Sequence, residues 1–389
     1  MQYDFDQVVD RSKNLSAKYD ERVKKFGTDD VIPLWIADMD FRTAQPVIDA
    51  LKARAEEGIW GYTARPASYF EAVKNWQKRR NSWDTDTALM SFSPGVVQTL
   101  SVMIRLYTPQ NGNVLIQTPV YGEFYDMTEL AGRHIIENQL VEQGGAWTVD
   151  WADFEEKLRS ADIFLLCNPH NPLGIVWTEE ELRRAGEIMR KYNLWVVSDE
   201  IHCDLIRCGR RHIPMARVME DYPKLITCMA PSKTFNLAGL AFSNIIIRDA
   251  ALRARFKERD KLFGAVNPMS LTAAKAAYEL GGAWHEALKE YLDGNFAFVK
   301  EFLTRELPEA VMYIPEATYL AWVDLSKCLP ETTDLPDFFA NRAGVLLEGG
   351  DGLFVGNAAG YVRLNLAMPR SIIETGLTRM VEAIRKERE

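Results

Sequence analysis

The stretch Ala230-Pro231-Ser232-Lys233-Thr234-Phe235-Asn236 directly follows the apolar run Leu225-Ile226-Thr227-Cys228-Met229 and so places a lysine at the end of a buried strand. Pro231 ends the strand pairing because it lacks an N–H donor, and the small Ser232 lets the backbone come close to a ligand. A lysine held in this way can form a Schiff base with an aldehyde. A solvated loop lysine is the alternative for this segment taken alone.

Two further apolar runs read as short strands that are buried on both faces. They are Asp162 to Cys167 and Leu194 to Ser198, and the amphipathic stretch Thr178 to Tyr192 lies between them. This order is typical of parallel strands joined by a crossover helix. The chain is therefore expected to be an α/β protein with a mostly parallel central sheet flanked by helices.

Polar residues follow each of the three apolar runs. Asn171 lies after the first run, Asp199 after the second and Lys233 after the third. In open α/β sheets, ligands bind in the crevice outside the carboxyl ends of the strands. The three side chains are therefore expected to converge on one region.

An amine, a carboxylate and an amide together suit pyridoxal 5′-phosphate (PLP). Lys233 would hold its aldehyde, and Asp199 would keep its pyridine nitrogen protonated so that the ring acts as an electron sink. Asn171 can donate a hydrogen bond to the phenolic oxygen, and Tyr121, at the end of another strand-like run, can cover the ring. The alternatives are a helix cap for Asp199, a turn for Asn171 and a core position for Tyr121.

A phosphate site is expected where a helix begins. Ser93-Pro94-Gly95-Val96-Val97 opens the apolar-periodic stretch Gln98 to Leu106, and Gly95 lets the backbone approach an anion that the helix dipole favours. A plain helix N-terminus is the alternative, because this spacing is not that of a phosphate loop.

Seven sequence segments together resemble the fold-type I PLP-dependent enzymes of the aminotransferase superfamily, and within them the MalY/PatB type of cystathionine β-lyase, or C-S lyase. The resemblance extends from about Ile32 to about Arg379. In chain order the segments are Pro33 to Phe41, Gly61-Tyr62-Thr63, Ser93 to Val97, Asn168 to Gly174, Ser198 to His202, Ala230 to Leu240, and Arg363 to Ala367.

The resemblance implies a role for each site residue. Lys233 would be the Schiff-base lysine, Asp199 the partner of the pyridine nitrogen, Asn171 the donor to the phenolic oxygen and Tyr121 the stacking ring. The other residues implied to bind the cofactor are His202, which lies nearby, and Gly95, Val96 and Ser232, which hold the phosphate.

Two implied roles concern the partner subunit and the substrate. Tyr62 would reach the phosphate of a neighbouring subunit, which implies a homodimer with shared active sites. Arg363 would bind the substrate α-carboxylate with two parallel hydrogen bonds, for which a guanidinium is better suited than an ammonium group. A surface arginine is the alternative for Arg363. Specificity for the side chain is expected from six residues: Trp35, Ile36, Ala37, Asp38, Trp60 and Tyr62. For the tryptophans among them, a packing role in the core of a Trp-rich chain is the alternative.

The expected reaction is α,β-elimination of cystathionine or a related cysteine S-conjugate to pyruvate, ammonia and a thiol. The chain departs from the general aminotransferase pattern at Ala230, where a small hydroxyl residue or glycine is usual, and at Ala241, where an arginine is usual. Both departures favour the C-S lyase branch, and the loss of the arginine puts cofactor affinity in question. The alternatives are a class I or II aminotransferase and, less favoured, a regulatory or binding protein of this fold.

Length and pattern predict two structural units. The 389 residues exceed one compact core. The large PLP-binding unit is expected at residues 46–281, and a discontinuous α+β unit at 1–45 and 282–389. The latter would contain a long helix from Ala283 to Arg305, short strands near 319–323 and 361–366, and a last helix that Ser371 caps over 372–384.

Composition and charge bear on partners and location. The net charge of −9 argues against nucleic acid as a partner. No segment reaches the roughly 18 apolar residues of a membrane span, and Met1 to Asp6 do not resemble a signal peptide, so a cytoplasmic protein is expected.

The five cysteines are expected to be buried thiols that form no disulfides. His202, Cys203 and Cys208 lack a fourth ligand, and no metal site is predicted.

Overall fold

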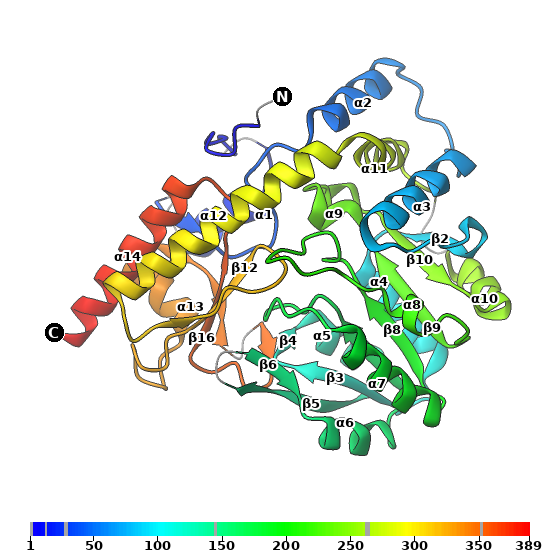
Figure 1. Ribbon diagram of the computed structural model, residues 1–389. Coiled ribbons are helices and arrows are strands. Elements are labelled where there is room, and N and C mark those ends of the chain that lie inside the picture. The colour runs from blue at the N-terminus through cyan, green and yellow to red at the C-terminus, as the bar shows by residue number, and fades with distance from the viewer. Residues whose placement is uncertain (1–2, 12–13, 27–29, 144–145, 261–264, 351–352) are drawn as a thin grey trace.

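The computed structural model describes residues 1–389 except 1–2, 12–13, 27–29, 144–145, 261–264 and 351–352 (Figure 1). The largest β-sheet of the structure has eight strands. In spatial order its strands are β2 (Met90–Ser93), β10 (Ser243–Ile247), β9 (Leu225–Met229), β8 (Trp195–Asp199), β7 (Ile163–Cys167), β3 (Asn113–Thr118), β5 (His134–Gln143) and β6 (Ala146–Val149).

The middle of this sheet is parallel and its edges are antiparallel. The neighbours β9, β8, β7, β3 and β5 run in one direction, whereas β10 and β6 run in the opposite direction. Strands β7 and β9 are buried along their whole length, which explains their continuous apolar sequence. The predicted α/β arrangement with a mostly parallel sheet is confirmed.

Helices flank the large sheet. They are α4 (Val96–Tyr107), α5 (Glu123–Leu130), α6 (Trp151–Leu158), α7 (Glu179–Lys191), α10 (Ala250–Asp260) and α11 (Pro268–Leu280). The crossover helix α7 starts at a capping box in which Thr178 and Glu181 each bond to the other's backbone. Its buried side chains, among them Leu182 and Met189, join a core with Leu166 and Val196 of the sheet.

A four-stranded antiparallel sheet with helices packed beside it forms a second part of the structure. It contains β11 (Val311–Met312), β12 (Leu320–Asp324), β16 (Tyr361–Asn365) and β14 (Glu348–Gly349). The long helix α12 (Gly282–Glu306) runs beside α14 (Arg370–Arg388), and α13 (Leu335–Phe338) lies near the same sheet (Figure 1). Residues of both long helices and of this sheet share one apolar core, for example Phe296, Leu364 and Leu377. The expected division at residues 46 and 282 stays a prediction.

The N-terminal segment joins the C-terminal part of the chain. It contains α1 (Ala17–Phe26) and β1 (Ile32–Pro33), and β1 pairs in parallel with β13 (Val345–Leu346). The remaining α-helices and strands in the described part of the chain are α2 (Gln45–Glu56), α3 (Ala67–Asn81), β4 (Val120–Tyr121), which pairs with β15 (Phe354–Val355), and the short helices α8 (Met215–Val218) and α9 (Pro231–Thr234).

The prediction that Ser371 caps the last helix is wrong. Helix α14 begins at Arg370, and Ser371 lies inside its first turn. Pro369 takes the capping position with a φ of −52° and a ψ of 136°, because the proline ring holds φ near the value that this position requires.

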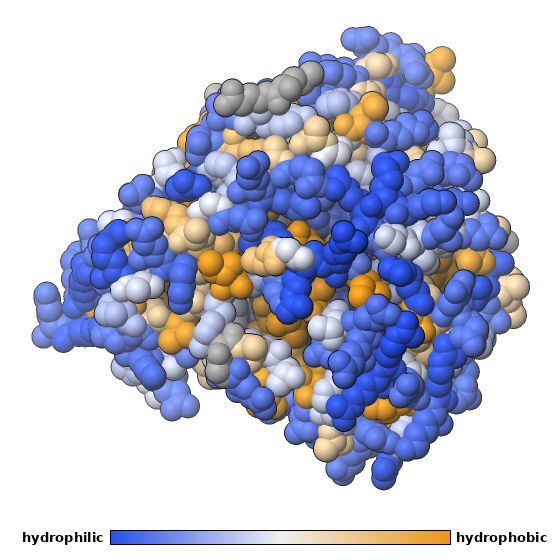
Figure 2. Space-filling view, in the orientation of Figure 1, coloured by the Kyte–Doolittle hydropathy of each residue, from blue (hydrophilic) through white to orange (hydrophobic). Residues whose placement is uncertain are grey.

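The surface is mainly polar. Figure 2 shows a largely hydrophilic face on which apolar residues gather near the middle. Among the described helices, none combines the length and the apolar character needed to cross a bilayer. Four of the five free cysteines are buried as expected, whereas Cys208 is exposed.

Candidate functional site

A cavity of about 900 Å³ opens at the carboxyl ends of the central strands. It is lined by eleven of the residues expected to bind the cofactor or the substrate, namely Ile36, Ala37, Gly95, Val96, Tyr121, Asn171, Asp199, His202, Ser232, Lys233 and Arg363. Trp35 and Tyr62 do not line it. The expected convergence of Asn171, Asp199 and Lys233 is therefore present in the structure.

Local sequence explains how the lysine reaches the cavity. Strand β9 ends at Met229, and Pro231 occupies the first turn of α9, where a missing N–H costs no helix hydrogen bond. Lys233 follows inside this single turn. Asp199 is the last residue of the neighbouring strand β8, so the amine and the carboxylate come from adjacent strand ends.

The Lys233 amine is buried and hydrogen-bonded to the main chain. Its Nζ donates to the Ala37 carbonyl oxygen at 2.7 Å. Burial, with a smaller effect of the Arg363 charge, lowers the pKa of Lys233 to about 8. A substantial fraction of this amine is therefore neutral near physiological pH, as a nucleophile or general base requires.

The Asp199 carboxylate is held in an unfavourable environment for its charge. Burial raises its pKa to about 7, and the hydrogen bond that the Ile201 N–H donates at 3.0 Å only partly opposes this effect. Nearby, burial lowers the pKa of His202 to about 3, and its Nδ1 has no hydrogen-bond partner in the described part of the chain. A cationic ligand group beside Asp199 would relieve the cost of its buried charge.

Arg363 lies on β16 and is 1% exposed. Its Nη1 donates to Asn171 Oδ1 at 3.3 Å and its Nη2 to the Trp35 carbonyl at 3.1 Å. Burial lowers the pKa of Arg363 to about 10. Trp35 thus contacts the site through its main chain, whereas its indole points away and donates to the Lys18 carbonyl at 3.0 Å.

Sequence reasoning missed Glu348, whose carboxylate forms an ion pair with Arg363 and lines the same cavity. Glu348 lies opposite Arg363 in the register of β14 and β16. The two-residue strand β14 has no apolar periodicity of its own. The signal that reveals Glu348 is therefore strand pairing, which the local sequence does not contain.

The loop after β1 is fixed by side chains of the site. Besides Lys233, the Tyr319 hydroxyl donates to the Ala37 carbonyl at 2.8 Å. Asn365 Nδ2 donates to the carbonyls of Ile36 at 2.7 Å and Asp38 at 2.6 Å. Tyr319 was also missed, although it lies in a segment expected to form a strand.

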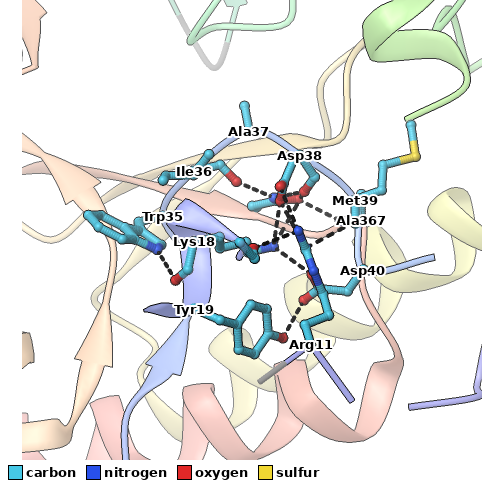
Figure 3. A network of polar contacts seen from close by, with 12 residues as sticks. Arg11, Lys18, Tyr19, Trp35, Ile36, Ala37, Asp38, Met39, Asp40 and Ala367 are labelled. Atoms are coloured by element: carbon cyan, nitrogen blue, oxygen red, sulfur yellow. Dashed lines mark hydrogen bonds and ion pairs between the residues drawn. The ribbon is translucent and has the colours of Figure 1, made fainter. Parts of the chain in front are cut away.

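A partly buried cluster of charges holds the other side of this loop (Figure 3). Arg11 Nη2 lies 3.0 Å from Asp38 Oδ2, and Lys18 Nζ lies 3.3 Å from Asp40 Oδ1. The Tyr19 hydroxyl donates to Asp40 Oδ2 at 2.8 Å. Two cations and two carboxylates thus balance next to Ala37, and we call these five residues the N-terminal ion cluster. It fixes the loop whose carbonyl holds Lys233.

The start of α4 offers an anion site at one end of the cavity. Gly95 precedes the helix, and a Cβ at this position would lie 2.3 Å from Gln98 Oε1. Val96, Ser232 and Ala241 line the same cavity. Within the described residues its only lysine or arginine side chains are Lys233 and Arg363. An anion at α4 would therefore be held by amides and a hydroxyl, without the arginine that Ala241 replaces.

Tyr62 and Trp60 lie outside the cavity of the single chain. Tyr62 is 99% exposed and Trp60 is 54% exposed. Both belong to the segment that connects α2 and α3.

Residues 29–380 match the family model described as Aminotransferase class I and II. The chain is 40% identical to the cystathionine β-lyase PatB of Bacillus subtilis (strain 168), over 98% of this chain and 99% of the relative. It is 34% identical to the protein MalY of Escherichia coli (strain K12), over 99% of this chain and 100% of the relative.

Two solved structures share almost the whole architecture. The PLP-bound C-S lyase from Staphylococcus hominis has a TM-score of 0.94 and 38% identity, covering 99% of this chain and 98% of that chain. Cystalysin from Treponema denticola, which contains a PLP cofactor, has a TM-score of 0.95 and 34% identity, covering 99% of this chain and 100% of that chain.

Proposed function

Because the chain belongs to the aminotransferase class I and II family, we propose that it is a PLP-dependent carbon–sulfur β-lyase. Its substrates would be cysteine S-conjugates such as L-cystathionine, and its products pyruvate, ammonia and a thiol. The observation that carries the proposal is the pairing of Lys233 and Asp199 at adjacent strand ends in one cavity. The family resemblance and the fold-type I architecture expected from the sequence are confirmed by the relatives described above.

The residues of the cavity fit PLP. Its protonated pyridine nitrogen would give the buried Asp199 carboxylate, whose pKa burial raises, a cationic partner, and the amides at Gly95 and Val96 with the Ser232 hydroxyl would hold the phosphate. Tyr121 would cover the ring and Asn171 would donate to its phenolic oxygen. When bound, PLP supplies an aldehyde that takes up an amine and a ring that stabilises negative charge at Cα.

The chain's own residues bind the substrate and move its proton. Arg363 would hold the α-carboxylate and so fix the Cα–H bond relative to Lys233. The Lys233 amine would remove the Cα proton as a general base, which its lowered pKa favours. Loss of the thiolate from Cβ then completes the elimination.

One assay separates elimination from transamination, the runner-up reaction. The protein is incubated with L-cystathionine in the absence of a keto acid, and pyruvate and thiol are measured. Pyruvate under these conditions supports the β-lyase. A transaminase would instead leave the C–S bond intact: it would form no pyruvate or thiol and, once a keto acid is added, would convert that keto acid into the corresponding amino acid. A protein that binds PLP but turns over no amino acid would point to the binding role instead.

A homodimer with shared active sites is part of the proposal. Tyr62, Trp60 and Ile59 expose large hydrophobic side chains on one segment, and a second subunit would cover them. Tyr62 would then reach the phosphate of the neighbouring site. A cytoplasmic location and the absence of nucleic acid partners stay predictions.

A further inference from the structure

Arg363, which would bind the substrate α-carboxylate and which we call the carboxylate clamp, is already paired with a carboxylate of its own chain. Glu348 and Arg363 are direct partners across β14 and β16, so their side chains lie on the same face of the sheet. Gly349 keeps the two strands close, because a Cβ there would lie 2.5 Å from the Tyr361 carbonyl oxygen. Backbone register, and not a single side-chain rotamer, therefore places Glu348 beside the clamp.

Most of the guanidinium nitrogens of Arg363 already have hydrogen-bond or ion-pair partners within the chain before any substrate binds. Nη1 donates to Asn171 and Nη2 to the Trp35 carbonyl, and Glu348 also contacts Nη2. Only Nε has no hydrogen-bond partner among the described residues. A substrate α-carboxylate that forms two parallel bonds with the guanidinium must therefore compete with Glu348.

The charge of the cavity indicates what Glu348 does after this exchange. Glu348 is 16% exposed and lines the cavity together with one further carboxylate beside Asp199, that of Glu123. No described arginine other than Arg363 lines it. A substrate with an anionic side chain would meet carboxylates without a second cationic clamp, whereas a cationic side chain would meet an opposite charge.

We propose that Glu348 is a specificity-determining residue of this enzyme. It occupies Arg363 until the substrate α-carboxylate replaces it, and it then favours amino acids with a cationic side chain over those with an anionic one. This inference rests on the proposed function, since it concerns the amino acid that the clamp receives.

The test measures binding of three amino acids with the same five-carbon skeleton to the PLP-loaded protein by calorimetry. L-Ornithine carries a cationic side chain, L-norvaline a neutral one and L-glutamate an anionic one, and none has a leaving group at Cβ. We expect L-ornithine to bind more tightly than L-glutamate by about tenfold or more. A wild-type protein that prefers L-glutamate overturns the proposal without any variant.

Two substitutions assign the preference to one carboxylate. Glu348→Gln should reduce the ratio of the two dissociation constants to near unity and tighten the binding of L-norvaline, because the competitor of the α-carboxylate loses its charge. Glu348→Asp should keep the order. Glu123→Gln is the matched control: a larger change of the ratio with this variant than with Glu348→Gln would overturn the assignment.

A parallel assay with S-ethyl-L-cysteine keeps the two proposals apart. Absence of pyruvate from this neutral conjugate would contradict the lyase, whereas the binding order of the three amino acids reports on Glu348 alone. If pyruvate forms and Glu348→Gln leaves the binding order unchanged, the β-lyase stands and the role of Glu348 falls.

Discussion

Lys233 Nζ donates a 2.7 Å hydrogen bond to the carbonyl oxygen of Ala37, which also accepts one from the Tyr319 hydroxyl. The reactive amine is thus held by the main chain of a loop that belongs to the N-terminal segment. This arrangement keeps the amine at the carboxyl ends of the strands while burial lowers its pKa to about 8.

The lowered pKa of Lys233 predicts when the cofactor-free protein takes up PLP. Because only the neutral amine attacks an aldehyde, the rate of uptake should rise with pH through about 8 and level off above it. Stopped-flow measurement of the visible absorbance of bound PLP gives this profile. Lys233→Ala should lose that absorbance and the turnover. A rate that still rises near pH 10 would mean that the lysine is solvated.

Arg363→Lys should lower kcat/KM for every amino-acid substrate by a similar factor. A lost bidentate pair corresponds to about 2 kcal/mol or more, since an ammonium group cannot form two parallel bonds with a carboxylate. Arg379→Lys, at a partly exposed pair with Asp30, is the matched control and should change little. A change in preference between substrates, with one of them unaffected, would show that Arg363 is not a general carboxylate clamp.

The N-terminal ion cluster should contribute strongly to stability. Asp40→Asn leaves Arg11 and Lys18 with one carboxylate fewer at a site where Asp40 is 3% exposed, and breaking such a buried pair costs about 3 kcal/mol or more. Urea unfolding measures the change. Asp84→Asn removes a carboxylate that also pairs with two lysines but is 52% exposed, and it should have little effect.

The same variant tests whether the cluster positions the loop. Because Asp38 and Asp40 follow directly after Ala37, whose carbonyl oxygen accepts the hydrogen bond of Lys233, Asp40→Asn should shift the pH profile of PLP uptake as well as stability. Loss of stability with an unchanged profile would leave the cluster a purely structural role.

The sequence predicted the parts of the site that depend on local signals. Lys233 and Asp199 each follow a continuous apolar run, and such runs identify buried strands without knowledge of the rest of the fold. Their convergence then follows from the general placement of ligand sites in parallel sheets. Glu348 depends instead on the register between two short strands, and the ion cluster depends on the packing of the N-terminal segment. Neither leaves a periodic pattern in the sequence.

Trp35 shows a different limit of sequence reasoning. An aromatic side chain was expected to face the substrate, yet the indole bonds to Lys18 and it is the carbonyl of Trp35 that contacts Arg363. Main-chain atoms carry no residue-specific signal, so only the structure shows this contact.

The proposal of shared active sites predicts complementation between two inactive variants. Lys233→Ala removes the reactive amine, and Tyr62→Ala removes the hydroxyl that would reach the neighbouring subunit. In a mixed dimer one site would carry both defects and the other neither, so unfolding and refolding the two variants together should restore lyase activity. Mixing Lys233→Ala with Arg363→Lys should restore none, because both residues line the cavity of the same chain. Equal results for the two mixtures would contradict the sharing of sites.

Asp199 should destabilise the cofactor-free protein above neutral pH. Its pKa is raised from 3.8 to about 7 in the folded state, so folding binds a proton between these values and the carboxylate opposes folding once it is charged. Asp199→Asn should therefore raise the Tm of the cofactor-free protein at pH 8 and give little difference near pH 4. PLP should reduce this gain, because its protonated pyridine nitrogen would stabilise the wild-type carboxylate and not the amide. Thermal unfolding at the two pH values, with and without PLP, separates these effects, and a gain at pH 8 that PLP leaves unchanged would remove Asp199 from the cofactor site.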